Sequence, residues 1–531
     1  GGGGGDQGRG GGTARGGARA TAPPGARPGP GRALPPRCSA CSANLSEVVA
    51  DETQSVAGRR RDDACESDWI WDREVETAPP EATFAQAAAA WGKQLTHLVD
   101  GSGFYQEKLR EAGAATSAPG LGDLHRLPFT TKEELKQAID AHPPFGSNLA
   151  VPAELVKRIY QTSGSTGAPS VIALTRADID TWTAIGSRTY YATGIHDHSA
   201  VLSTFGAGPF VAGHTHFVLS RIGARSVPVA PGDTDRVLFG LRAGLADTLM
   251  GTPSFAQYLA NRLEQGGSDP RSLALTHIVT GGEPGGGIPA IRDHIQTALA
   301  VTVNEVMGIG DVAPSLFGEC PRQQGMHFCG TGYIWPELVD PDTRESMAIE
   351  EGTVGELVYT SLARQAMPVV RFLSADIVRI EGTSCDCGRT SFRMRCIGRR
   401  DDMFIVRGVN VYPTAILAVV GDFRPAVTGR ARVIRTGTDV SVEPPIPIEV
   451  EIPNQATVES ELATRIEAEV RARLTFRCRV TLLPEPKFGD SGYQTRLTVT
   501  RPCRSREADS SPPTCPGARR SGLADSVQRS G

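Results

Sequence analysis

Lysine is scarce in this chain of 531 residues, and arginine carries nearly all of the positive charge. The lysines are Lys93, Lys108, Lys132, Lys136, Lys157 and Lys487. A GC-rich genome produces such a bias without any functional cause. Lys487 nevertheless stands alone in the last two thirds of the chain, where a function that needs a lysine has no other to use.

Strong net charge and long apolar runs are also missing. Lys and Arg number 55 against 59 Asp and Glu, so the formal net charge is −4 and no positive field favours nucleic acid. No apolar run reaches the length of a transmembrane helix, and no charged segment followed by an apolar core marks a signal peptide. We therefore expect a cytoplasmic protein that binds neither nucleic acid nor membrane.

Residues 1–66 and 501–531 are poor in aromatic residues and rich in small residues, Pro and Arg. Neither end can bury enough apolar surface to offset the loss of chain entropy, so we expect both to be disordered. The chain lacks an initiating Met, which leaves open whether the first stretch arises from the choice of reading frame. Within it, Cys38 and Cys41 form an isolated C-x-x-C motif that we interpret as incidental.

The middle of the chain alternates strands with helices, a pattern typical of βα units on a largely parallel sheet. Strands are predicted at 171–174, 226–230, 248–250 and 277–280, and helices at 87–98, 104–111, 255–265 and 288–299. The segment PFTTKEEL (128–135) places a capping threonine before a helix, and TRAD (175–178) is predicted to start another. After Gly355 the pattern changes to shorter β-rich runs, such as 356–360 and 369–372.

A charged junction at 399–402 precedes a second set of short elements. These are 409–420, 446–452, a charged helix at 459–474 and a strand at 479–483. We therefore predict an α/β fold with a large domain over 67–399 and a small α+β domain over 400–500, between the disordered ends 1–66 and 501–531.

The segment QTSGSTGAPS (161–170) concentrates glycine and hydroxyl side chains directly before a predicted strand. Its backbone N–H groups, with the hydroxyls of Thr162, Ser163, Ser165 and Thr166, can converge on one anion. It is not a Walker-type P-loop, because no Gly-Lys-Ser/Thr opens a helix. The segment is typical of a glycine-rich hairpin over a phosphate and equally of a solvent-exposed linker.

Three later segments suit other parts of a nucleotide. The turn after Thr280 lies at the end of a strand, where open α/β sheets bind ligands. Glu305 follows the strand-like run 300–303 and can hold a magnesium ion beside a polyphosphate. Asp376 can accept hydrogen bonds from a ribose diol. Taken alone, each residue favours a simpler interpretation, a solvated surface carboxylate for Glu305 and a turn aspartate for Asp376.

In this order, the motifs resemble those of the phenylacetate–CoA ligase family of adenylate-forming enzymes. The resemblance runs from about Trp71 to about Arg501. It rests on RIYQTSGSTGAP, VTGGEP, EVMG followed by GEC, GELVYTSLARQAMPVVRF, CDCGR and, most specifically, IGRRDDMFIVRGVNVYP. It implies an adenylation domain followed by a small mobile C-terminal domain, and a possible homodimer.

The resemblance also implies roles for individual residues. The implied ATP-phosphate loop is Ser163, Gly164, Ser165, Thr166 and Gly167, with Thr166 able to reach magnesium. The implied adenine pocket is Gly282, Glu283 and Pro284. Glu305 is the implied metal ligand, and Asp376, assisted by Arg399, is the implied ribose ligand. Asp401 is the implied hinge, and Gly408 lies on the implied face toward the thiol channel. His216 and Phe217 are implied neighbours of the aromatic acid. A His-x-His metal pair at His214 and His216 is an alternative to packing or exposed histidines.

The implied function is ATP-dependent ligation of a phenylacetate-like aryl acid to coenzyme A through an acyl-adenylate, releasing AMP and pyrophosphate. ATP, Mg²⁺ and coenzyme A are the implied cofactors and co-substrates. Two alternatives remain: an adenylating enzyme with a carrier-protein acceptor, and a nucleotide-binding homologue with weak catalysis. The last is favoured by one departure from the family pattern, because the expected adenylation lysine is replaced by a region where Lys487 lies early and Arg496 is fork-shaped.

A second departure lies before Glu305. The family usually has a Tyr-Gly pair where this chain has VTVN (301–304), which removes an aromatic wall from the nucleotide pocket.

Cys320, His327, Cys385 and Cys387 form the second constellation. Three thiolates and one imidazole suit a closed tetrahedral zinc site, and some members of the family carry zinc at such positions. Cys329 competes for one ligand position. The alternatives are a disulfide, disfavoured in a reducing cytoplasm, and unliganded buried thiols. Four protein ligands leave no open position, so we expect the zinc to be structural.

Overall fold

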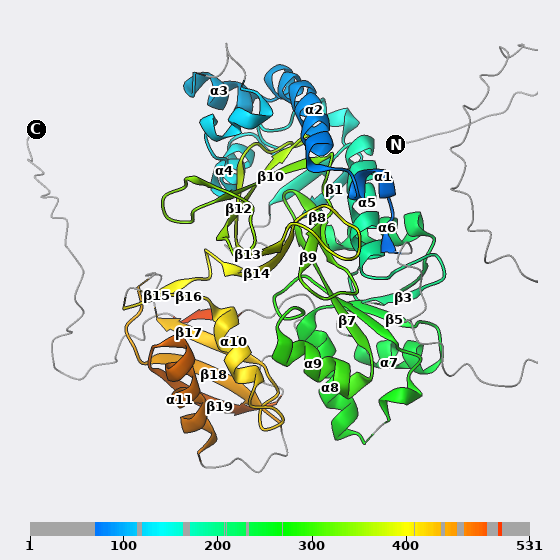
Figure 1. The fold of residues 1–531 in the computed structure, drawn as a ribbon, viewed down its shortest axis with the longest axis vertical. Helices are drawn as coiled ribbons and strands as arrows, with labels where there is room; N and C mark the ends of the chain where they lie inside the picture. Colours follow the sequence, from blue (N-terminus) through cyan, green and yellow to red (C-terminus); the bar gives the residue numbers. More distant parts are fainter. Residues whose placement is uncertain are drawn as a thin grey trace, which may run out of the picture. The chain divides into compact units, whose positions relative to one another are not determined.

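The computed structural model describes residues 69–113, 119–162, 170–206, 208, 210–229, 233–267, 269–407, 409–436, 441–453, 461–485 and 497–501. All of them belong to one compact unit, Cys65–Gly531. The predicted disordered ends fall outside these residues except for Arg501, which ends a strand, and the predicted domain limits stay predictions. The α/β fold class is confirmed by the mixture of a large sheet and packed helices (Figure 1).

One sheet dominates the described chain, with the strand order β11-β10-β12-β13-β14-β9-β8-β7-β6-β5-β3-β4. Its parallel part consists of β3 (Ala200–Ser203), β4 (Arg225–Pro228), β5 (Thr248–Gly251), β6 (His277–Thr280) and the start of β7 (Thr302–Ile309). Its antiparallel part consists of β8 (Ala313–Glu319), β9 (Met326–Phe328), β10 (Ile334–Val339), β11 (Ser346–Met347), β12 (Val354–Ser361), β13 (Phe372–Gly382) and β14 (Arg393–Arg399). The prediction of a largely parallel sheet is therefore wrong beyond β7, because the later strands are joined by turns and not by crossover helices.

Helices cover the parallel part of the sheet. They are α5 (Arg176–Ala192), α6 (Thr215–Ile222), α7 (Thr234–Arg242), α8 (Pro253–Gln265) and α9 (Pro289–Leu299). Thr175 caps α5 in a reciprocal capping box with Asp178, as its position before the helix predicts. Proline occupies the first turn of α8 and α9, where its missing N–H leaves no helix bond unmade.

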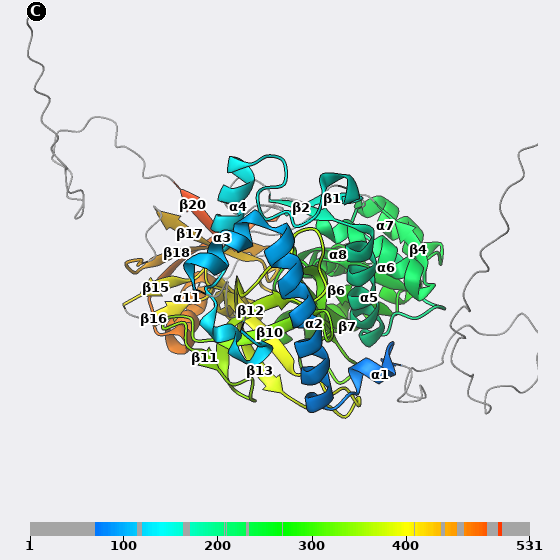
Figure 2. The same ribbon diagram turned by 90° about the horizontal axis from the view of Figure 1, so that it is seen from above.

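The N-terminal helices pack at the antiparallel end. They are α1 (Arg73–Glu76), α2 (Pro80–Gly101), α3 (Gly103–Glu111) and α4 (Lys132–Ala141), the last capped by Thr131. In Figure 2, α2 crosses the sheet near β10. The ring centroids of Phe84 on α2 and Trp335 on β10 are 5.6 Å apart. None of the described helices is both long and apolar enough to cross a membrane.

The C-terminal elements form separate small sheets. A two-stranded sheet contains β15 (Phe404–Val406) and β16 (Val409–Val411). The other has the order β19-β18-β17-β20, with β17 (Ala431–Thr436), β18 (Ile446–Ile452), β19 (Cys478–Pro484) and β20 (Thr498–Arg501). Helices α10 (Pro413–Gly421) and α11 (Leu462–Leu474) pack against each other and contribute to its core.

Two local predictions are wrong. The run 369–372 is not a strand along its length, because β13 begins only at Phe372. Glu305 was predicted to follow the strand-like run 300–303, but it lies inside β7, which continues to Ile309. The apolar composition of both segments predicted a strand in each. The ends of the observed strands differ from the prediction because they depend on hydrogen bonding to neighbouring strands.

Candidate functional site

The base of the glycine-rich loop is a short antiparallel hairpin of β1 (Arg158–Gln161) and β2 (Val171–Leu174). The N–H of Thr162 donates to the carbonyl of Ser170 (3.1 Å), and the N–H of Ser170 donates to Oγ1 of Thr162 (3.2 Å). A Cβ atom on Gly310 would lie 3.0 Å from the Thr162 methyl group, so the base abuts the end of β7. The predicted cradle itself, Ser163 to Gly167 with Thr166, lies outside the described residues.

The predicted adenine turn follows β6 at the same edge of the sheet. Glu283 accepts a hydrogen bond from the N–H of Ser254 (2.9 Å) and so ties this turn to the start of α8. Gly282 is exposed and Pro284 is half-buried. Thr280, the last residue of β6, is the register partner of Glu305. The structure therefore brings the turn and Glu305 to one edge.

Glu305 is half-buried and lies against the turn at Gly287. A Cβ atom on Gly287 would lie only 2.4 Å from Oε2 of Glu305, so a larger residue would displace the carboxylate. Burial and, to a smaller extent, the nearby carboxylate of Glu319 together raise the pKa of Glu305 to about 7, against the opposing effects of Arg292, the Gly287 backbone and Arg395. A cation beside a carboxylate in this environment would stabilise its ionised form.

Asp376 is buried at 4% exposure and faces Arg399 across the β13–β14 pair. Nη1 of Arg399 donates to Asp376 at 2.9 Å, and its Nε and Nη2 each donate to Asp401 at 2.9 Å. Burial raises the pKa of Asp376 to about 6, which Arg399 counteracts. One guanidinium therefore joins the predicted ribose ligand to the predicted hinge residue.

The two residues predicted near the aromatic acid occupy different surroundings. Nε2 of His216 lies 3.0 Å from the carbonyl of Phe205, whose ring is within 3.9 Å of a Cβ built on Gly282. His216 therefore lies close to the adenine turn. The ring of Phe217 instead stacks on His214 at 5.3 Å.

His214 is buried, and its Nε2 lies 3.1 Å from the hydroxyl of Thr183. Burial lowers the pKa of His214 to about 4, so the imidazole is neutral at pH 7. These contacts favour the packing interpretation of His214 over a metal pair with His216.

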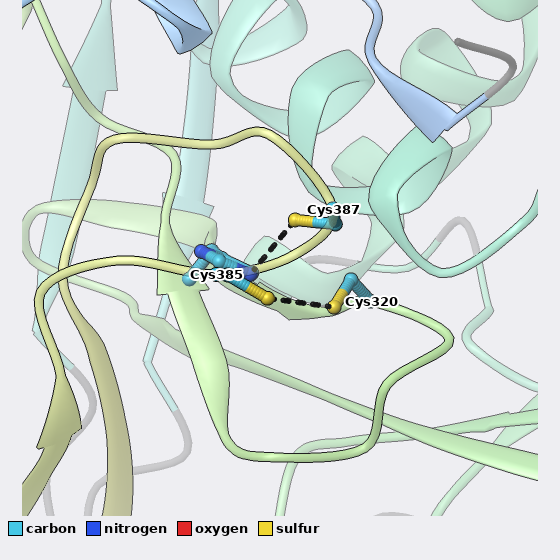
Figure 3. A group of neighbouring side chains, drawn as sticks. Cys320, Cys385 and Cys387 are labelled. Carbon is cyan, nitrogen blue, oxygen red and sulfur yellow. Dashed lines mark hydrogen bonds between the residues drawn. The ribbon is translucent and has the colours of Figure 1, made fainter. Parts of the chain in front are cut away.

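The predicted metal ligands come together from three segments of the sheet. Cys320 follows β8, His327 lies on β9, and Cys385 and Cys387 lie on the loop between β13 and β14. Their ligand atoms all lie within 4.8 Å of one another. Figure 3 shows the three labelled cysteine side chains converging on one point. Cys329 is not in the group, since its thiol donates to the carbonyl of His327 (3.4 Å).

The spacing of these atoms fits a tetrahedral metal ion. A Zn–S bond of about 2.3 Å places two sulfurs of a tetrahedron about 3.8 Å apart. The Sγ atoms of Cys320 and Cys385 are 3.8 Å apart, and Sγ of Cys387 is 3.4 Å from Nε2 of His327. Without an ion, shared hydrogen bonds raise the pKa of the Cys320 thiol and lower those of Cys385 and Cys387.

Other predicted residues are not placed by the described chain. Gly408, Lys487 and Arg496 lie outside it, so the hinge-side glycine and the adenylation cation are untested. Conversely, the structure adds Arg292 and Glu319, which the sequence analysis did not select. Glu319 belongs to the GEC motif that carried the resemblance, and this was the signal available for it.

A scan against models of protein families finds no match. Among curated proteins, the chain is 36% identical over 356 residues to the phenylacetate-coenzyme A ligase of Thermus thermophilus, a match that covers 66% of this chain and 78% of that protein. It is 33% identical over 346 residues to the enzyme of the same name from Pseudomonas putida, covering 64% and 76% of the two chains.

Solved structures give a similar result over more of the chain. A 2-hydroxyisobutyryl-CoA ligase in its postadenylation state, in complex with 2-HIB-AMP, matches with a TM-score of 0.73 and 25% identity, over 84% of this chain and 94% of that chain. The same ligase with 2-HIB-AMP and CoA in its thioesterification state matches with a TM-score of 0.60 and 26% identity, over 82% and 93%.

Proposed function

Because the chain belongs to the phenylacetate–CoA ligase family, we propose that it ligates an aryl carboxylic acid to coenzyme A with ATP, through an acyl-adenylate. A phenylacetate-like acid is the proposed substrate. The observation that carries the proposal is the buried Asp376 held by Arg399. Glu305, paired with Thr280 at the end of β6, is the second carboxylate of the proposal. Asp376 would bind the ribose, and Glu305 would bind the metal of the same nucleotide.

Two transfers make up the proposed reaction. A carboxylate oxygen of the acid attacks the α-phosphorus of ATP, and the bond to pyrophosphate breaks. The thiolate of coenzyme A, its proton lost to solvent, then attacks the acyl carbon, and AMP leaves with the bridging oxygen. Charge develops on phosphate oxygens in the first step, so catalysis depends mainly on positioned donors and cations.

In this scheme Asp376 accepts hydrogen bonds from the ribose, and Arg399 keeps its carboxylate ionised and oriented. Glu305 would hold Mg²⁺, which neutralises phosphate charge when bound. The half-buried position of Glu305 and its raised pKa fit that ion, because a divalent cation offsets the cost of ionising it. His216, in contact with Phe205, is proposed to line the acid pocket. Phe217, whose ring stacks on His214, stays a predicted neighbour of the acid.

We further propose that Cys320, His327, Cys385 and Cys387 bind structural Zn²⁺. The 3.8 Å and 3.4 Å separations support four ligands around one ion. Three thiols so close cannot all ionise without a cation among them. The centre has no open position and no role in the two transfers. A cytoplasmic location and a homodimer stay predictions.

ATP–pyrophosphate exchange with a panel of aryl acids tests the proposed function. Exchange that depends on the acid, together with formation of a CoA thioester, is the expected result. Exchange without use of coenzyme A would favour a carrier-protein acceptor. Bound nucleotide with no exchange under any acid would contradict the adenylation chemistry itself.

The Asp376–Arg399 pair predicts how nucleoside binding depends on pH. An acid with a pKa of about 6 is ionised above that pH and protonated below it, so the carboxylate loses acceptor capacity as the pH falls from 7 to 5. The affinity for adenosine, which has no phosphate to titrate, should fall over this range. Calorimetric titration at a series of pH values measures it.

Two variants control this prediction. Arg399→Met removes the cation that lowers the pKa of Asp376, so the midpoint should move to higher pH. Asp376→Asn should bind adenosine weakly at every pH. A midpoint near 6 that persists in Asp376→Asn would assign the effect to another group.

A further inference from the structure

Glu305 is held from its backbone side by a buried ion pair that the proposed chemistry does not use. Nη2 of Arg292 lies 2.5 Å from Oε2 of Glu319, and the two side chains are 7% and 0% exposed. The same Oε2 atom accepts the backbone N–H of Glu305 at 3.2 Å. One oxygen of Glu319 thus receives hydrogen bonds from Arg292 and Glu305.

Arg292 also fixes the other wall of the Glu305 site. Its Nε donates to the carbonyl of Gly286 at 2.8 Å, in the turn against which the Glu305 carboxylate lies. Arg292 therefore reaches from α9 to both sides of Glu305. It contacts the turn at Gly286, against which the Glu305 side chain lies, and it contacts the Glu319 carboxylate, which accepts the backbone N–H of Glu305.

The backbone around Glu319 is fixed as well. Nδ2 of Asn304 donates to the carbonyls of Glu319 (3.4 Å) and Cys320 (3.3 Å), and Oδ1 of Asn304 lies 2.9 Å from Nε2 of His277. Two neighbouring residues of β7 thus bond to the end of β8, Asn304 through its side chain and Glu305 through its backbone N–H. This leaves little freedom for Glu305 to shift along its strand.

Stability alone does not explain why a charged pair is buried here. Burying both ions costs solvation free energy that their attraction repays only in part, and apolar residues of similar volume often stabilise a fold as well. What an apolar pair could not supply is the directed set of bonds to the Gly286 carbonyl and the Glu305 N–H. Oε1 of Glu319 has no partner among the described residues, so the pair is not optimised for its own bonding.

We infer that Arg292 and Glu319 are positioning residues that orient the Glu305 carboxylate toward the magnesium–nucleotide complex. The inference rests on the proposed function, which assigns magnesium to Glu305. Neither side chain touches the nucleotide in this arrangement; both act through Glu305 and its facing turn. Their loss should weaken binding of ATP with magnesium and leave binding of metal-free ATP unchanged.

The test is calorimetric titration of the full chain with ATP and no acid, in excess Mg²⁺ and again in EDTA. The double variant Arg292→Met with Glu319→Leu removes both charges together, so neither ion is left buried alone. We expect its affinity for MgATP to fall about tenfold, equivalent to ~1.4 kcal/mol, with metal-free ATP unchanged within about twofold. Glu319→Gln keeps an acceptor for the Glu305 N–H and should lose less.

Glu337→Gln is the matched control. Glu337 also pairs with a buried arginine, Arg371 (3.2 Å), and also has one oxygen without a partner in the described chain. It should lower thermal stability without changing the affinity for MgATP. If the double variant does not fold, hydrogen exchange of the β7 peptide in Glu319→Gln replaces it, and faster exchange than in the unaltered chain is expected.

The outcomes separate the two proposals. A folded double variant that binds MgATP as tightly as the unaltered chain overturns the inference and leaves the proposed function intact. Equal losses for MgATP and metal-free ATP also overturn it, because a general structural defect would do the same. No MgATP binding by the unaltered chain would overturn the proposed function and the inference with it.

Discussion

Glu305→Gln is expected to lower the rate of acid-dependent ATP–pyrophosphate exchange by about 100- to 1,000-fold, the usual effect of removing one strong electrostatic contact from a transition state. The glutamine has the same shape but carries no charge for Mg²⁺. Because Glu305 lies against Gly287 with no space for a larger group, an isosteric replacement keeps the turn in place. The rate of exchange at saturating and at limiting Mg²⁺ measures the effect.

A surface carboxylate provides the control for this variant. Glu351 is exposed in the turn before β12, and Glu351→Gln should retain the full exchange rate. The Glu305→Gln protein should unfold at a temperature close to that of the unaltered chain, since it replaces a half-buried charge with a neutral group. Normal exchange in Glu305→Gln would remove Glu305 from the proposed metal site.

Cys385→Ser is expected to lose the metal and to lower the unfolding temperature by about 10 °C. Removing one ligand leaves the other thiolates crowded without a full set of bonds to an ion, a loss of about 3–5 kcal/mol for a broken buried charge cluster. For domains of this size each kcal/mol corresponds to about 2–4 °C. Metal analysis of the purified protein and a thermal scan measure both effects.

Cys329→Ser is the matched control, because Cys329 is buried beside the centre but outside the group of four. It should keep about one equivalent of zinc. Less than about half an equivalent of metal in the unaltered protein, with no change in Cys385→Ser, would rule the site out. Equal metal loss in both serine variants would instead move Cys329 into the ligand set.

Sequence patterns predicted the elements that carry a strong local signal. The strands at His277–Thr280 and Ile446–Ile452 were predicted at their observed limits. The predicted capping threonine is Thr131, and the helix predicted to start at 175–178 begins after Thr175. Such signals depend on neighbours within a few residues. Short β-rich runs were predicted after Gly355, but their antiparallel direction was not, because strand direction is set by long-range pairing that no local pattern records.

The candidate site divides in the same way. The resemblance implied that Arg399 assists Asp376, and the structure joins the two by a hydrogen bond. Arg292 lies in a helix with an ordinary amphipathic pattern, so its sequence context gave no sign of a role. Only the folded structure brings it to Glu319. The source of the adenylation cation, Lys487 or Arg496, stays a prediction because both lie outside the described residues.

The proposed function requires that the acid is activated as an adenylate. Phenylacetate labelled with ¹⁸O in its carboxylate tests it, with ATP and coenzyme A, and mass spectrometry of the products. Since the carboxylate oxygen that attacks phosphorus leaves with AMP, we predict one ¹⁸O in each AMP and one in each thioester. Unlabelled AMP, with the ¹⁸O in phosphate or pyrophosphate, would contradict activation through an acyl-adenylate.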